Sequence, residues 1–225
     1  MTRAVFFDVG GTLIRAWPSV GAVYARVGRN CGIEATDEAM EQAFRTAWRE
    51  LRPGPLTTSD KQWWRTLVQR ALASIGHEEN EDYFIALYEA FAAADAWRVF
   101  PDVVPALHVV RKREWHVGAI SNWDQRLRPL LERLALSQYF DSIIVSCEVG
   151  AEKPDPRIFR AALQAAGVRA EEAWHFGDAA SEDVRGAEAA GIRGVLIDRN
   201  SVDGDRQLMT ALRKIFGRDI PFPES

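Results

Sequence analysis

The stretch Val5-Phe6-Phe7-Asp8-Val9-Gly10-Gly11-Thr12-Leu13 decides the fold of this chain. Its apolar beginning shows no polar alternation, which predicts a strand buried on both faces of a parallel sheet. The strand ends in one carboxylate, Asp8, which is followed at once by two glycines and a threonine. A turn of this kind presents a carboxylate beside backbone N–H groups and suits an anionic ligand such as phosphate. We therefore expect Asp8 to serve as a nucleophile or a metal ligand.

Beyond Pro101 the chain alternates short apolar runs with amphipathic helical patterns. Strands that alternate with helices in this way predict an α/β fold with a Rossmann-like, doubly wound parallel sheet. The predicted strands, including the first, are Ala4–Phe7, Val117–Ile120, Ser142–Ser146, Ala173–Phe176 and Gly194–Ile197.

Between about Pro18 and Trp97 the sequence shows helical periodicity and no convincing strand. Four apolar stripes predict four helices, and Arg52-Pro53-Gly54-Pro55 separates the second from the third. The chain therefore divides into an α/β core domain, residues 1–16 and 98–225, and an inserted four-helix-bundle cap, residues 17–97. An insertion after the first strand overhangs the carboxyl ends of the strands, where open α/β sheets bind ligands, so we expect a lid.

Tryptophan is abundant, with eight residues in the chain, and most of those in or beside the cap are expected to fill its small core. Trp17 and Trp123 stand next to the motif residues and are candidates to line a substrate pocket. The tryptophans in or beside the cap are Trp17, Trp48, Trp63, Trp64 and Trp97.

Polar groups follow several of the predicted strands. Asp8 and Asp178 end the first and fourth strands, Ser121-Asn122 end the second, and Lys153 follows the third. Each has an ordinary alternative as a helix cap, a turn residue or a solvated side chain, and it is their joint order that favours a site. Two carboxylates at one sheet edge suit a hard cation such as Mg²⁺, and a fixed lysine would neutralise a phosphoryl group.

In this order the motifs resemble those of the haloacid dehalogenase-like hydrolase superfamily, in its branch with a small helical cap after the first strand. The resemblance covers the α/β domain from end to end. The motifs are Asp8-Val9-Gly10-Gly11-Thr12-Leu13, Ser121-Asn122, Lys153-Pro154, and Gly177-Asp178 with Asp183 five positions beyond Asp178.

The resemblance implies a Mg²⁺ site. Asp8 would form an aspartyl-phosphate and also bind the cation. The carbonyl oxygen of Gly10 and the carboxylate of Asp178 would be further ligands. Asp183 would support Lys153 or a water on the metal.

The resemblance also implies a phosphate site. Lys153 and Ser121 would hold the phosphate group, and Asn122 and the Gly11-Thr12 turn would complete the cradle. The expected partner is a small phosphorylated molecule.

Gly10 departs from the family pattern, in which the residue two positions after the nucleophile is an aspartate that protonates the leaving group and then activates water. General acid–base catalysis of that kind contributes roughly 10²–10⁴-fold. We therefore expect a slow Mg²⁺-dependent phosphatase. The substitution Gly10→Asp is expected to raise the rate if the turn accommodates the larger residue.

Several alternatives stay open at this point. A catalytically feeble module that binds a phosphate ligand or a protein is favoured by Gly10. A dehalogenase would use Asp8 without a metal, and a phosphonate hydrolase would need a cap lysine, for which Lys61 is the only candidate. The turn after Asp8 also resembles the first phosphate loop of sugar kinases, but a second such loop is missing from the sequence.

Composition narrows the function classes. A net charge of -4 gives no electrostatic case for a nucleic-acid partner or an acidic membrane surface.

No apolar run reaches the length of about 20 residues that spans a bilayer, and no signal peptide is apparent, so we expect a cytoplasmic location. Cys31 and Cys147 form neither a metal-binding nor a disulfide pattern. Substrate identity and oligomeric state are not readable from the sequence.

Overall fold

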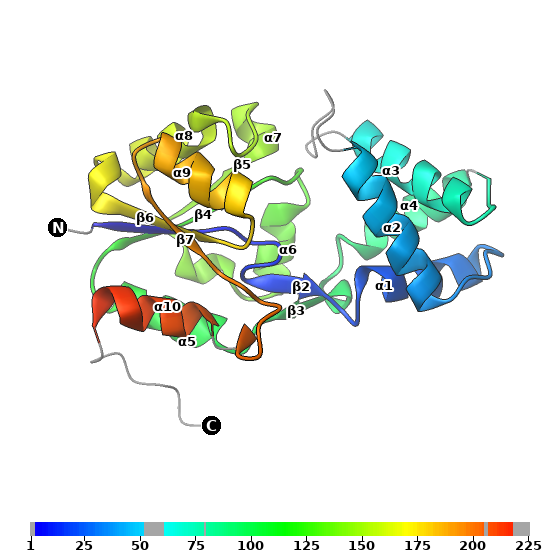
Figure 1. Ribbon diagram of the computed structural model, residues 1–225, viewed down its shortest axis with the longest axis horizontal. Helices are drawn as coiled ribbons and strands as arrows, with labels where there is room; N and C mark the ends of the chain where they lie inside the picture. The colour runs from blue at the N-terminus through cyan, green and yellow to red at the C-terminus, as the bar shows by residue number, and fades with distance from the viewer. Residues whose placement is uncertain (1–2, 52–60, 79, 205–206, 218–225) are drawn as a thin grey trace. The chain divides into compact units, whose positions relative to one another are not determined.

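The computed structural model describes residues 3–51, 61–78, 80–204 and 207–217 (Figure 1). The chain divides into a core unit, Met1–Ile14 with Val99–Ser225, and a cap unit, Arg15–Arg98. In the described parts of the chain, no helix combines the length and the apolar character needed to cross a membrane.

The core unit contains a five-stranded sheet in the order β5-β4-β1-β6-β7, and every neighbouring pair is parallel. The doubly wound α/β prediction is confirmed, and β1 lies at the centre, where its four residues are fully buried. The strands are β1 (Ala4–Phe7), β4 (His116–Ser121), β5 (Ser142–Val145), β6 (Ala173–Gly177) and β7 (Arg193–Leu196).

The register of β1 sets the position of the residues that follow it. Phe7 is paired with Ala119 of β4 and with Phe176 of β6. The N–H of Asp8 continues this ladder by donating to the carbonyl of Phe176 at 2.8 Å. Asp8 therefore emerges at the carboxyl edge of the sheet, next to the ends of β4 and β6.

Helices cover both faces of the sheet, with α8 and α9 on one face and α5 and α10 on the other (Figure 1). The first turn of α8 is fixed by Asp155, whose carboxylate accepts from the N–H of Arg157, and by Pro156 at the first helical position. Gly167 ends α8 in the left-handed conformation that glycine adopts readily. The core helices are α5 (Val103–Arg111), α6 (Leu127–Arg133), α7 (Ser146–Val149), α8 (Pro156–Ala166), α9 (Arg185–Ala189) and α10 (Gln207–Phe216).

The cap unit is helical, and α1 packs on α2 and α4 while α2 packs on α3. The predicted break at residues 52–55 lies outside the described residues; α2 ends at Leu51 and α3 begins at Lys61. The described cap helices are α1 (Val20–Asn30), α2 (Asp37–Leu51), α3 (Lys61–Ser74) and α4 (Glu81–Ala90).

Aromatic side chains fill the cap core. Trp63 is 1% exposed and meets Trp48 and Trp64 edge-on, with ring centroids at 5.1 and 4.9 Å. Trp17, in contrast, is 37% exposed and stays outside this core. The prediction that the cap tryptophans fill this core is confirmed for Trp48, Trp63, Trp64 and Trp97 and is wrong for Trp17, whose role in lining a pocket stays a prediction.

A two-stranded sheet, β2 (Ile14–Ala16) with β3 (Trp97–Val99), was not expected from the sequence. Strands of three residues are too short to show a periodic pattern. The boundaries between core and cap that the sequence predicts, at residues 16 and 98, fall in these two strands.

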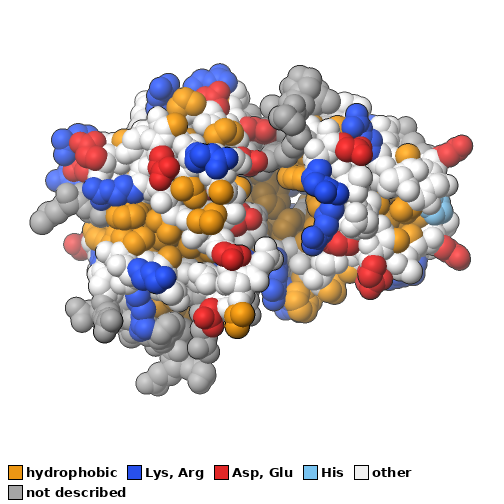
Figure 2. All heavy atoms as spheres, in the orientation of Figure 1, with side chains coloured by type: hydrophobic (Ala, Val, Ile, Leu, Met, Phe, Trp, Pro, Cys, Tyr) orange, Lys and Arg blue, Asp and Glu red, His pale blue; other side chains and the backbone are white. Residues whose placement is uncertain are grey.

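The surface carries mixed charge. Figure 2 shows acidic and basic side chains interspersed over the visible face of each unit. This visible face therefore offers no broad basic field of the kind that nucleic-acid-binding proteins use.

We expect Trp63→Ala to lower the free energy of unfolding of the cap by about 3–5 kcal/mol, because it leaves a cavity in an aromatic core. Trp17→Ala is the matched control and should cost less than about 1 kcal/mol, since Trp17 is 37% exposed and is not part of the cap core. Chemical denaturation followed by tryptophan fluorescence measures both, and equal losses would show that Trp63 does not anchor the cap.

Candidate active site

The turn after β1 is closed by its own backbone. The carbonyl of Val9 accepts hydrogen bonds from the N–H groups of Thr12, Leu13 and Ile14, at 3.3, 2.8 and 3.0 Å. The N–H of Gly11 donates back to the carbonyl of Ile14 at 2.8 Å. The N–H groups of Gly11 and Thr12 are thus engaged within the turn in this structure, so their role toward a phosphate remains a prediction.

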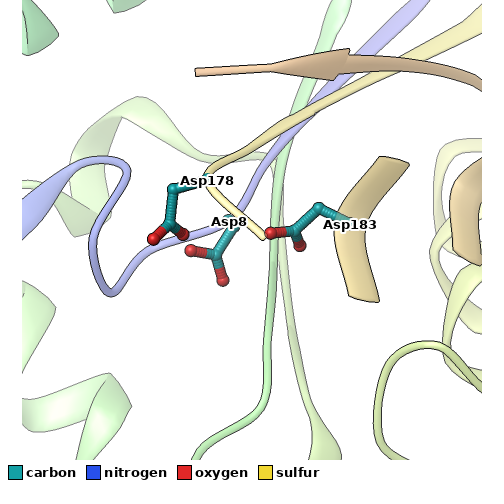
Figure 3. Close-up of side chains that lie close together, drawn as sticks. All are labelled: Asp8, Asp178 and Asp183. Carbon is teal, nitrogen blue, oxygen red and sulfur yellow. The ribbon is translucent and has the colours of Figure 1, made fainter. Parts of the chain in front are cut away.

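Three carboxylates converge at the carboxyl edge of the sheet. Asp8, Asp178 and Asp183 each have an oxygen atom within 4.8 Å of those of the others. Asp8 follows β1, Asp178 follows β6, and Asp183 lies on a single π-helical turn, Ala180–Val184. In Figure 3, Asp183 reaches toward Asp8 from the side opposite to Asp178. A π-helical turn is a rare conformation that is frequent at functional sites.

Two glycines make this convergence possible. A Cβ atom at Gly11 would lie 2.4 Å from Oδ2 of Asp178, and one at Gly177 would lie 2.2 Å from Cγ of Asp183. Gly11 also has a φ of +85°, a conformation that L side chains rarely adopt. Only glycine at these two positions lets the carboxylates of Asp178 and Asp183 approach the turn and the strand end.

Lys153 is the cation of the site. Its Nζ donates to Oδ1 of Asp8 at 2.6 Å and to Oδ1 of Asp183 at 2.5 Å, and its side chain is almost fully buried. Among the described residues, Oδ2 of Asp8 accepts no hydrogen bond. One positive charge therefore faces three carboxylates, a balance that favours binding of a further cation.

Burial and charge shift the pKa of every ionisable group in this cluster. Burial raises the pKa of Asp8 to about 8, because Lys153 offsets the lost solvation only in part. Burial and the charge of Asp183 also raise the pKa of Asp178. Burial opposes the charged form of Asp183 too, but Lys153 and a hydrogen bond from His175 outweigh it and lower its pKa. Lys153 keeps a raised pKa despite burial because Asp8 and Asp183 surround it.

The cluster fits Mg²⁺ by the chemistry of its donors. Hard cations take carboxylate, carbonyl and water oxygens, and Asp8, Asp178 and Asp183 supply such oxygens around one point. Asp8 and Asp178 are the better candidates, because both oxygens of Asp183 are already used, by Lys153, His175 and the N–H of Ala179. The cluster could hold the cation between the ends of β1 and β6.

Asn122 holds Lys153 rather than pointing freely into the site. Its Oδ1 accepts from the N–H of Lys153 at 2.7 Å, and its Nδ2 donates to the carbonyl of Lys153 at 2.9 Å. This paired contact fixes the backbone from which the lysine extends. Ser121, at the end of β4, is 1% exposed and lies beside it in the chain.

His175 is a site residue that the sequence analysis did not identify, and the structure gives it a defined contact with Asp183. It is fully buried in β6, and its Nε2 lies 3.0 Å from Oδ1 of Asp183. Its Nδ1 finds no hydrogen-bond partner among the described residues, so Nε2 carries the proton and donates to Asp183. The only sequence feature that could have pointed to His175 as a site residue is its position in β6, two residues before Gly177, so that both side-chain positions lie on the same face of the strand.

A second buried ion pair, between Arg199 and Asp102, contacts the backbone of the turn after β1. Arg199 donates to the carbonyl of Thr12 from Nε at 3.0 Å and from Nη2 at 2.7 Å, and it pairs with Asp102 at 2.9 Å. Asp102 in turn accepts from the N–H of Leu208 at 2.8 Å. The hydroxyl of Thr12 donates to Oδ1 of Asp178 at 3.3 Å. Thr12 therefore couples Asp178 of the carboxylate cluster to the buried ion pair.

Lys61 lies among aromatic rings of the cap. Its Nζ stands 4.9 Å from the ring centre of Tyr88 and 5.8 Å from that of Phe84. These cation–π contacts give the lysine a structural role within the cap.

The family follows from this fold and these motifs. A family profile described as a hydrolase, haloacid dehalogenase-like hydrolase, matches residues 2–191. The chain belongs to the haloacid dehalogenase-like hydrolase family, and the resemblance seen in the sequence is confirmed.

Named relatives agree with this class. The chain is 35% identical over 207 residues to mouse haloacid dehalogenase-like hydrolase domain-containing protein 3, covering 87% of this chain and 81% of the relative. It is 31% identical over 235 residues to a phosphoserine phosphatase of Thermus thermophilus, covering 94% of each chain. Among solved structures, a HAD phosphatase from Thermococcus onnurineus is 27% identical, with a TM-score of 0.67 and coverage of 96% of this chain and 98% of that one.

We expect Mg²⁺ to raise the melting temperature of the protein, because a ligand that binds only the folded state stabilises it by about 2.7 kcal/mol at 100 times its Kd. Asp178→Asn should remove most of this shift, since it takes one charge from the cluster. Asp203→Asn, at an exposed position, is the control and should keep it. An equal shift in all three proteins, measured by differential scanning fluorimetry, would place the cation elsewhere.

Proposed function

We propose that this protein is a Mg²⁺-dependent phosphatase that acts on a small phosphorylated molecule through an aspartyl-phosphate on Asp8. The observation that carries the proposal is the cluster in which the buried Lys153 bridges the buried Asp8 and Asp183 while the exposed Asp178 completes a set of three carboxylates. Similarity to phosphatases in sequence and in structure supports it.

The contacts of Asp8 suggest which oxygen reacts. Lys153 holds Oδ1 at 2.6 Å, which leaves Oδ2 for attack on phosphorus. In the first step the bond from Oδ2 to phosphorus forms, the bond from phosphorus to the leaving group breaks, and the leaving group takes the electron pair. In the second step water attacks phosphorus, the carboxylate of Asp8 is restored, and the protons of the water pass to phosphate and solvent.

The remaining residues of the cluster orient and balance charge. A bound Mg²⁺ would neutralise the phosphate oxygens. Lys153 would neutralise charge on the phosphoryl group, and Asn122 fixes the backbone of Lys153. Asp183 and His175 hold the ammonium group in place through Oδ1 of Asp183.

Gly10 supplies no acid or base two residues after the nucleophile. Without an acid–base side chain at this position, the reaction loses the rate enhancement of about 10²–10⁴-fold that proton transfer gives. We therefore propose a slow rate on esters whose leaving group needs a proton.

A module that binds a phosphate ligand without turnover is the second candidate, and Gly10 is the observation that favours it. It would retain the cation site and phosphate affinity, and would show no release of phosphate that depends on Asp8. A dehalogenase is a third possibility within the family, although it would have no use for a set of three carboxylates.

We expect Asp8→Asn to reduce Mg²⁺-dependent hydrolysis of an aryl phosphate by at least about 10³-fold, because the amide cannot serve as the nucleophile. An aryl leaving group departs without a proton, so the assay reports on the nucleophile and the cation despite Gly10. Asp203→Asn is the matched control and should keep the wild-type rate.

Undiminished turnover by Asp8→Asn would exclude the aspartyl-phosphate mechanism. Phosphate binding without turnover in the wild type would favour the binding module. Release of chloride from a 2-chlorocarboxylic acid, again dependent on Asp8 but not on Mg²⁺, would favour the dehalogenase.

A further inference from the structure

The side chain packed against Gly10 is the indole ring of Trp123. A Cβ atom built at Gly10 would lie 3.0 Å from Cζ3 of Trp123 and 3.8 Å from Cε3 and Cη2. These three atoms belong to the six-membered ring of the indole. Ordinary contacts between carbon atoms are about 3.5–4.0 Å, so the ring crowds the place that the Cβ atom of a side chain at position 10 would take.

The backbone at Gly10 does not itself require glycine. Of the two neighbouring glycines, only Gly11 has a positive φ, at +85°. An L side chain at position 10 would therefore meet no conformational strain, and the obstacle to it is Trp123. This separates the two glycines: Gly11 makes room for Asp178, and Gly10 makes room for Trp123.

The main chain of Trp123 is firmly held. Its backbone N–H donates to Oγ of Ser146 at 2.9 Å, and its backbone carbonyl accepts from the same hydroxyl at 3.0 Å. The N–H of Cys147 donates to that carbonyl at 3.3 Å. The side chain is only 9% exposed, so a shift of the ring to admit a neighbour would disturb a packed environment.

We propose that Trp123 is a specificity-determining residue that takes the place of an acid–base side chain and so limits the enzyme to phosphates whose leaving group departs as a stable anion. Acyl phosphates and aryl phosphates have such leaving groups. This inference rests on the proposed phosphatase function, and it adds the chemical class of the substrate.

The reaction balances without a proton donor. As Oδ2 of Asp8 bonds to phosphorus, a carboxylate or phenolate leaves with the electron pair of the broken bond. An alkoxide is a far poorer leaving group and needs a proton, which the ring of Trp123 does not supply. Hydrolysis of the aspartyl-phosphate is itself the cleavage of an acyl phosphate, since Asp8 departs as a carboxylate.

The first test is a series of leaving groups. With the wild type, kcat/KM for substituted aryl phosphates and acetyl phosphate should fall steeply as the pKa of the leaving group rises. Glycerol phosphate should be slower by a factor on the order of 10²–10⁴. A flat dependence with good turnover of glycerol phosphate would overturn the inference while leaving the aspartyl-phosphate chemistry intact. No turnover of any probe that depends on Asp8 would overturn the proposed function and this inference with it.

The second test is a cycle of Gly10→Asp and Trp123→Ala, assayed on glycerol phosphate. Gly10→Asp alone should give no gain, because the ring obstructs the carboxylate. The double variant should gain at least about 10-fold in kcat over either single variant. The combination of Gly10→Asp with Trp115→Ala is the control, since Trp115 packs on Phe216 at 4.7 Å, and it should give no gain.

A stability cycle keeps the inference testable if the Asp variants fold poorly. Gly10→Ala should lower the melting temperature in the wild type, because its Cβ meets the indole, and should lower it less, or not at all, in the Trp123→Ala background. Equal losses in both backgrounds, or an equal gain in activity from Gly10→Asp with and without Trp123, would show that the ring does not occupy this position.

Discussion

The site depends on one buried interaction, the placement of the ammonium group of Lys153 between Asp8 and Asp183. Without that charge, two carboxylates would face each other in a buried environment, and separation of a buried ion from its partner is strongly destabilising. The backbone of Lys153 is fixed by Asn122, and Asp183 is fixed by His175. The lysine is thus the structural centre of the cluster, and it engages only Oδ1 of the two oxygens of Asp8.

The close approach of side chains to the backbone is the second constraint on the site. Each of three glycines makes room for a different side chain. Gly11 admits Asp178, Gly177 admits Asp183, and Gly10 admits Trp123. The first two approaches gather negative charge at the edge of the sheet, and the third brings an apolar ring to the turn. The turn is therefore shaped by side chains from other segments as much as by its own sequence.

The arrangement of the sheet was predictable because buried parallel strands leave continuous apolar runs, and all five core strands were found. The position of Lys153 near Asp8 followed from the convergence of strand ends at one edge. The contacts of His175, Trp123 and Arg199 were not predictable, because they depend on packing between distant segments and leave no periodic pattern. The strands β2 and β3 were missed for their shortness.

The central place of β1 has a consequence for the order in which the protein can fold during synthesis. The strand at Ala4–Phe7 is made first, yet its two neighbours are residues 116–121 and 173–177, and the whole cap unit is made in between. At a synthesis rate of about 5–20 residues per second, the second neighbour of β1 is completed on the order of ten seconds after β1 itself. The cap helices can form among themselves during this interval, whereas the strand that precedes Asp8 is among the last elements to be enclosed.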